Sequence, residues 1–128
     1  MPLSNASDRP VYLNLLRIRL PIPGLMSIVH RLTGVLMFIA IPFMLYLFDL
    51  SLASEAGCRE AAALLQTPIG MLLLFGLLWS LFHHLFAGIR YLLIDVDLGV
   101  DKAIARTTAW IVLLAAPVVA LLVTWGLL

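Results

Sequence analysis

The chain has 128 residues, of which 63% are hydrophobic and 12% are charged, and its formal net charge is +1. A soluble domain of this length cannot bury so much apolar surface, so the composition excludes an ordinary water-soluble protein. The single cysteine, Cys58, excludes a disulfide framework, a cysteine-ligated zinc site and an iron–sulfur cluster within this chain. The net charge says nothing about partners by itself, and we expect no nucleic acid among them.

Residues 1–22 are expected to form a polar arm. Proline, asparagine, aspartate and arginine interrupt this segment, and no apolar stretch precedes a small-residue cleavage site, so a signal peptide is not expected. Pro21, Pro23 and Gly24 then break the chain, and proline is tolerated in the first turn of the helix that follows.

Three stretches, 32–48, 61–89 and 107–128, contain no aspartate, glutamate, lysine or arginine. Each reaches or exceeds the roughly 17–25 residues that a helix needs to cross a bilayer. The sequence therefore predicts an all-α membrane protein, one domain over residues 1–128, with transmembrane helices at about 23–48, 68–94 and 103–128. Within the first loop, Ser54, Glu55 and the segment 59–65 suggest a short surface helix.

Basic residues are distributed unevenly along the chain. The N-terminal segment and the second loop hold seven of the eight, all but Arg59: Arg9, Arg17, Arg19, Arg31, Arg90, Lys102 and Arg106. Because basic residues are retained on the cytoplasmic side, the N-terminus is expected in the cytoplasm and the C-terminus outside it.

His84 is the most informative residue of the second expected helix. A histidine some two turns inside a membrane helix is costly unless it pairs, lines a cavity or binds something, and a neutral imidazole is a frequent axial ligand of haem iron. Gly88 and Tyr91 share its face, and the glycine leaves room for a flat macrocycle or another helix. Residue types alone leave haem ligation and a packing role, with a bond to a backbone carbonyl, equally open. His83 points about 100° away and is expected to be a hydrogen-bonded packing residue.

Ser27, His30, Arg31 and Gly34 form a polar stripe at the start of the first expected helix. A hydroxyl and a guanidinium one turn apart can hold a quinone oxygen, and arginine and histidine can bind carboxylates such as haem propionates. The alternative is that Arg31 extends to lipid phosphates and that Ser27 bonds its own helix. The sequence leaves both interpretations open.

Arg90 and Asp95 lie at the cytoplasmic end of the second expected helix. An arginine in this place is usually a topology anchor. Asp95 is expected to pair with Arg31 or Arg90, or to support proton transfer at a site there.

Two motifs connect these residues with a known family. Ser27-x-x-His30-Arg31-x-Thr33-Gly34 and His84-x-x-x-Gly88-x-Arg90, followed by Asp95, resemble the cytochrome b membrane-anchor subunit of succinate dehydrogenase, or complex II. The resemblance covers nearly the whole chain, including the order of the three spans. One position departs from it, because Tyr91 stands where the family often has histidine.

The resemblance implies a cofactor, a substrate and partners. His84 matches the ligand of haem b, Ser27 and Arg31 match the ubiquinone site, and His30 and Arg31 match positions near the haem propionates. A small anchor subunit supplies the second axial histidine in the family, and electrons from succinate oxidation arrive through a flavoprotein subunit and an iron–sulfur subunit. The implied location is the bacterial inner membrane, with a periplasmic C-terminus.

Two alternatives remain from the residues themselves. His30 and His84, on adjacent helices, could hold haem without a partner, as in a self-contained cytochrome. A cofactor-free assembly or structural protein is the other alternative.

Overall fold

The computed structural model describes residues 19–127, and these fold into helices joined by short turns. The helices are α1 (Ile22–Ala53), α2 (Glu55–Leu65), α3 (Pro68–Asp95) and α4 (Lys102–Leu127). The all-α prediction is confirmed, as are the three long apolar helices. Most of the expected N-terminal arm, together with Arg9 and Arg17, lies outside the described residues.

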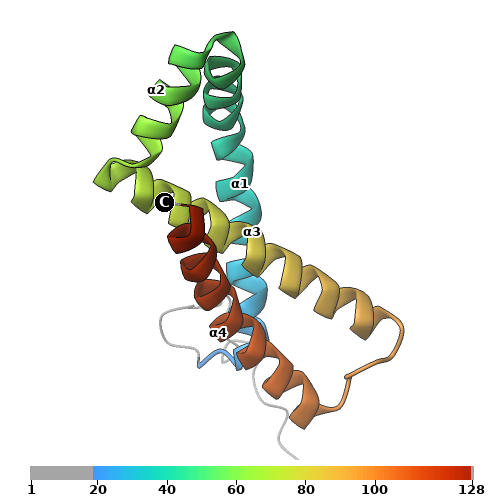
Figure 1. Cartoon of the computed structure of the whole chain (residues 1–128). Helices are drawn as coiled ribbons and strands as arrows, with labels where there is room; N and C mark the ends of the chain where they lie inside the picture. Colours follow the sequence, from blue (N-terminus) through green and yellow to red (C-terminus); the bar gives the residue numbers. More distant parts are fainter. Residues whose placement is uncertain (1–18, 128) are drawn as a thin grey trace, which may run out of the picture.

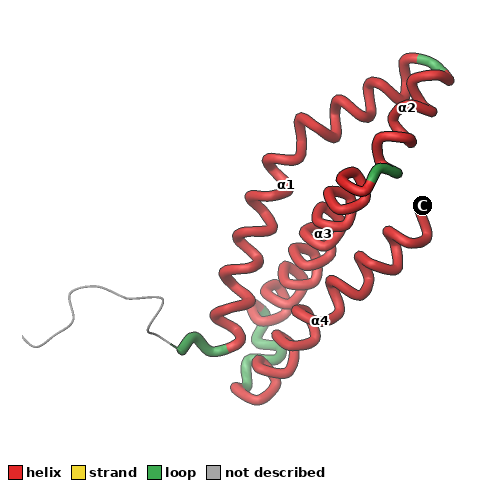
Figure 2. The backbone as a smooth tube through the Cα atoms, turned by 90° about the vertical axis from the view of Figure 1, so that its left-hand side faces the viewer, coloured by secondary structure: helices red, strands yellow, loops and turns green. Residues whose placement is uncertain are grey.

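The three long helices alternate in direction, and α3 lies between α1 and α4 (Figures 1 and 2). The start of α1 and the turn between α3 and α4 lie at one end of the molecule. The short helix α2 lies at the other end, beside the last turns of α1. This arrangement puts the polar stripe at the start of α1 close to the second half of α3.

The connection between α1 and α3 differs in detail from the expected loop. α1 continues beyond Phe48 to Ala53, whereas α2 begins at Glu55 and ends at Leu65, as expected for the short surface helix. Ser54 separates the two helices. Its extended backbone ends α1, and its hydroxyl caps the start of α2 by accepting a bond of 3.0 Å from the Gly57 amide. Only the end of α1 differs from the expected position at about residue 48, because the helix continues up to Ser54.

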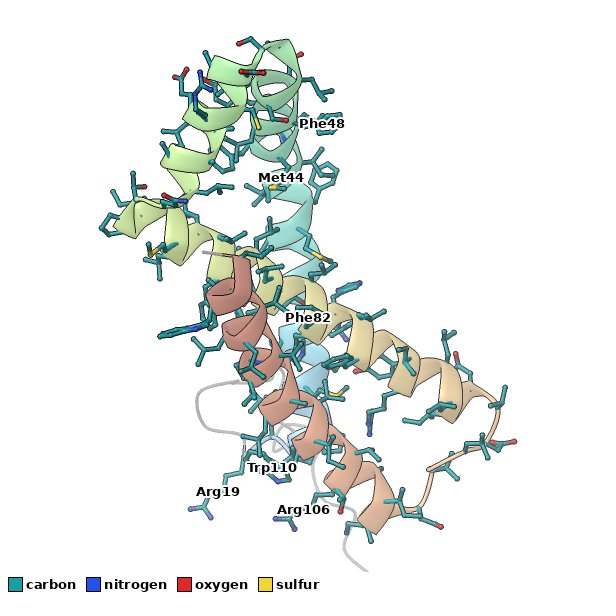
Figure 3. All side chains as sticks on the ribbon, in the orientation of Figure 1. Arg19, Met44, Phe48, Phe82, Arg106 and Trp110 are labelled. Carbon is teal, nitrogen blue, oxygen red and sulfur yellow. The ribbon has the colours of Figure 1, made fainter. Side chains whose placement is uncertain are left out.

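The exposed surface is largely apolar, as a membrane environment requires. Phe38 is 74% exposed and Trp125 is 86% exposed. In Figure 3, Met44 and Phe48 project from the half of α1 that adjoins α2. In water such a surface would be unfavourable, whereas lipid tails solvate it and the helices satisfy their own backbone. The chain is thus a multi-pass membrane protein.

Small residues bring α3 and α4 together. Ala87 on α3 and Ala109, Ala116 and Ala120 on α4 are fully buried. Lipid supplies no hydrophobic drive between helices, so close backbone approach over small side chains is what stabilises such a contact. α1 contributes far less, with Met26, Thr33 and Leu47 as its buried residues.

Arg90 is buried between α3 and α4, where the sequence suggested a surface topology anchor. The residue is 7% exposed. Its Nε donates to the Thr108 hydroxyl and its Nη2 to the Ala105 carbonyl, both at 2.9 Å. Hydrogen bonds from an ionised donor are stronger than neutral ones, so Arg90 fixes the first turns of α4 against α3.

We expect Thr108→Val to destabilise the assembled protein by about 1–3 kcal/mol, because a buried ionised donor loses its acceptor. The measurement is the thermal midpoint of the purified complex in detergent. Thr107→Val is the matched control, since Thr107 is exposed and its hydroxyl bonds the Ala103 carbonyl of its own helix at 3.1 Å. Equal midpoints for the two variants would contradict the role of Arg90.

Candidate functional site

His30 of α1 and His84 of α3 meet where the two helices cross. Their rings are stacked, with centroids 4.0 Å apart and an interplanar angle of 15°. His30 thereby covers one face of the His84 ring. The structure brings together two residues that the sequence placed on separate helices with different roles.

A glycine one turn after each histidine makes this close approach possible. A Cβ at Gly34 would lie 3.0 Å from His84 Cε1, and a Cβ at Gly88 would lie 4.0 Å from His30 Nε2. Each ring therefore faces the glycine on the opposite helix. The space beside Gly88, which the sequence assigned to a macrocycle or another helix, contains the His30 ring.

One ring nitrogen of His84 is committed inside the protein. Its Nδ1 lies 3.0 Å from the His30 carbonyl oxygen and 3.5 Å from the Thr33 hydroxyl oxygen. Because a carbonyl can only accept, Nδ1 carries the hydrogen and Nε2 keeps a lone pair. The two interpretations of His84, a carbonyl bond and a metal ligand, are therefore compatible, since each uses a different nitrogen.

His83 is fully buried and lies near Trp79, with ring centroids 6.2 Å apart. Neither of its nitrogens has a hydrogen-bond partner within residues 19–127. The packing position agrees with expectation, but the expected hydrogen bond is not found in this part of the chain.

Two more buried polar atoms lie beside the histidine pair. Tyr91 contacts His30 edge-on, with ring centroids 5.3 Å apart. Neither the Tyr91 hydroxyl nor His30 Nε2 has a partner among the described residues. Unpaired buried polar atoms are rare in folded proteins, so this cluster is where a bound group or an ordered water would satisfy them.

Ser27 and Arg31 lie on the same face of α1, toward its start. Arg31 is exposed, and its Nη2 is 3.4 Å from the Ser27 hydroxyl. Asp95 is exposed at the end of α3. The expected ion pair with Arg31 or Arg90 is not found in residues 19–127, where the recorded ion pair joins Glu55 and Arg59. Arg90 uses its donors on α4.

An apolar groove of about 380 Å³ lies between α1 and α3. It is further from the start of α1 than the histidine pair is. Leu36 and Ala40 line one wall, and Gly76, Leu77 and Ser80 line the other. Ser80 is one turn before His84 on the same helix face.

The described residues hold no cluster of three or more histidine, cysteine or acidic side chains that could bind a metal ion. The sequence interpretation missed Thr33, which is fully buried at this site. The sequence could have indicated a role for Thr33 at this site, because it lies between His30 and Gly34 on the same helix.

Comparisons with known proteins show which family the chain resembles. The family described as "Succinate dehydrogenase/Fumarate reductase transmembrane subunit" matches residues 5–124. A "Succinate dehydrogenase cytochrome b556 subunit" of Paracoccus denitrificans is 27% identical over 118 residues, covering 92% of this chain and 91% of the relative. Proteins of the same description are 33% identical in Coxiella burnetii, covering 83% of this chain and 86% of the relative. In Rickettsia bellii the identity is 31%, with 86% of each chain covered.

Proposed function

The chain belongs to the family of succinate dehydrogenase and fumarate reductase transmembrane subunits, and on this premise we propose that it helps to bind one haem b and a quinone. It is a cytochrome b subunit of succinate dehydrogenase, the membrane anchor of complex II. In the proposed function the complex passes electrons from succinate oxidation to the quinone pool. This chain positions the cofactor, donates hydrogen bonds to it and surrounds it with apolar side chains.

The bond between His84 and the His30 carbonyl is the observation that carries the haem assignment. Metal-binding histidines commonly donate their other ring N–H to a backbone carbonyl, which fixes the ring and raises its basicity as a ligand. His84 has this arrangement already, with Nδ1 3.0 Å from the carbonyl oxygen. We therefore assign Nε2 of His84 as one axial ligand of the haem iron. When bound, haem supplies a one-electron carrier.

The stacked rings argue against the self-contained cytochrome. To hold one iron together, His30 and His84 would have to direct ring nitrogens at a shared space, whereas their rings lie face to face with centroids 4.0 Å apart. A second histidine from a small partner anchor subunit fits better. The largely uncovered surface of α1 supports such a partner, because its buried residues in this chain are few.

Ser27 and Arg31 are the proposed quinone donors. Both are near the start of α1, where a quinone head group can reach a hydroxyl and a guanidinium on one helix face. Arg31 is also proposed, with His30, for the haem propionates, and Asp95 for support of the quinone site. Electrons reach the quinone from an iron–sulfur subunit and a flavoprotein subunit docked on this side.

The proposed orientation puts the start of α1 and the α3–α4 turn in the cytoplasm and the C-terminus in the periplasm of a bacterial inner membrane. Arg19 and Arg106 lie at the same end of the molecule (Figure 3). Lys102 begins α4 at that end. This clustering supports the positive-inside assignment.

His84→Leu in the assembled complex should abolish or strongly perturb the low-spin b-type absorption spectrum, because the iron loses its ligand. His83→Leu, one position away, should retain that spectrum. Reduced-minus-oxidised spectra of both purified complexes decide the assignment. A silent His84 change together with a lost spectrum in the His83 variant would reverse it.

Ser27→Ala and Arg31→Leu should each weaken quinone binding by about 1–3 kcal/mol, because a quinone oxygen loses a donor in an apolar site. Succinate:quinone activity should fall much more than succinate oxidation by a dye that accepts electrons from the soluble subunits. Ser27→Ala should leave the haem spectrum unchanged, whereas Arg31→Leu should shift it. Unchanged quinone kinetics in both variants would remove these residues from the site, and equal losses with quinone and dye would indicate failed assembly.

The orientation can be tested with the chain's own thiol, because Cys58 is exposed on α2. A maleimide that cannot cross membranes should label Cys58 in intact spheroplasts. In a Cys58→Ser background, Asp101→Cys in the α3–α4 turn should be labelled only after lysis. The opposite pattern would invert the topology.

A further inference from the structure

A single backbone carbonyl, that of His30, connects Thr33 with His84. The Thr33 hydroxyl donates to this oxygen at 2.9 Å, and Nδ1 of His84 lies 3.0 Å from the same atom. A threonine hydroxyl bonded to a carbonyl one turn back is common in helices. Here that carbonyl also accepts from a histidine 54 residues away in the chain.

The two donors compete for the same acceptor. A carbonyl oxygen has two lone pairs and can accept both bonds, but each donor draws electron density from it and weakens the other bond. The Thr33 hydroxyl has one hydrogen, which is used on the carbonyl. Its 3.5 Å separation from Nδ1 is therefore a weak contact by comparison.

Burial keeps this competition in place. Thr33 is fully buried, so water cannot replace its hydroxyl and the surrounding medium screens the dipoles little. The branched side chain also has few rotamers available in a helix. The hydroxyl therefore holds a fixed orientation toward the carbonyl.

We propose that Thr33 is a positioning residue for His84, acting through the His30 carbonyl on the strength of the Nδ1–H bond. The inference rests on the proposed haem function of His84. By drawing density from the carbonyl, the hydroxyl limits how strongly that carbonyl polarises the His84 ring. The ring consequently donates less density through Nε2 than it would beside an unshared carbonyl.

The test is a redox titration of the b-type centre in the purified complex, together with its electron paramagnetic resonance spectrum. Thr33→Val keeps the shape but removes the hydroxyl, so the carbonyl should bind Nδ1–H more strongly. A more electron-rich ligand favours the oxidised iron, so the midpoint potential should fall and the resonance positions should shift. Thr33→Ser retains the hydroxyl, so its midpoint potential and resonance positions should equal those of the unsubstituted protein.

Thr124→Val is the matched control. Thr124 is also buried in a membrane helix, and its hydroxyl bonds the Ala120 carbonyl at 2.8 Å, on a helix that carries no proposed ligand. It should leave the potential and the resonance spectrum unchanged. If Thr33→Val does not assemble, Thr33→Cys gives a weaker donor of similar size and should lower the potential by a smaller amount.

Three results would overturn the inference. They are an unchanged potential and resonance spectrum in the Thr33 variant that assembles, a shift of equal size in Thr124→Val, or a shift that Thr33→Ser does not restore. Loss of the b-type spectrum is a separate question, decided by His84→Leu. If His84→Leu leaves that spectrum unchanged, the proposed haem function fails, whatever the Thr33 variants do.

Discussion

The hydrogen bond between His84 Nδ1 and the His30 carbonyl is the interaction on which the candidate site depends. In an apolar bundle an unpaired imidazole N–H would be unfavourable, because lipid tails offer it no hydrogen-bond acceptor. The bond commits one ring nitrogen, leaves the other for a ligand, and fixes the ring against α1. It requires close approach of two helices, which Gly34 and Gly88 permit.

The position of α3 is set from both sides. The histidine pair holds it to α1, while Arg90 and the buried alanines hold it to α4. Lipid gives no general hydrophobic drive for these contacts, so a few polar bonds and close backbone packing carry the association. A change at Thr108 therefore acts on the same helix that presents His84, although it lies on the opposite side.

The bundle is well packed on one side and open on the other. α4 buries a row of small residues against α3, whereas α1 buries little within this chain. Buried polar atoms of His30, His83 and Tyr91 have no partner among the described residues. Both features suit a subunit of a larger complex.

The sequence determined the class of structure. Uncharged runs of membrane-spanning length predict the three long helices, because a bilayer sets how many apolar residues a helix needs. Spacing along one helix also placed His84 with Gly88, and Ser27 with Arg31, since a turn of helix fixes which residues share a face. The motifs identified the family, which the match over residues 5–124 confirms.

Only the tertiary structure decided which faces meet. His84 bonds to a residue 54 positions away, and Arg90 bonds across 15 to 18 positions to α4. These pairings depend on the rotation and crossing of helices, which periodicity within one helix does not encode. The stacking of His30 on His84 and the contact of His84 Nδ1 with the His30 carbonyl follow from that crossing. The sequence suggested Ser54 and Glu55 for the start of α2, but it did not show that α1 continues to Ala53.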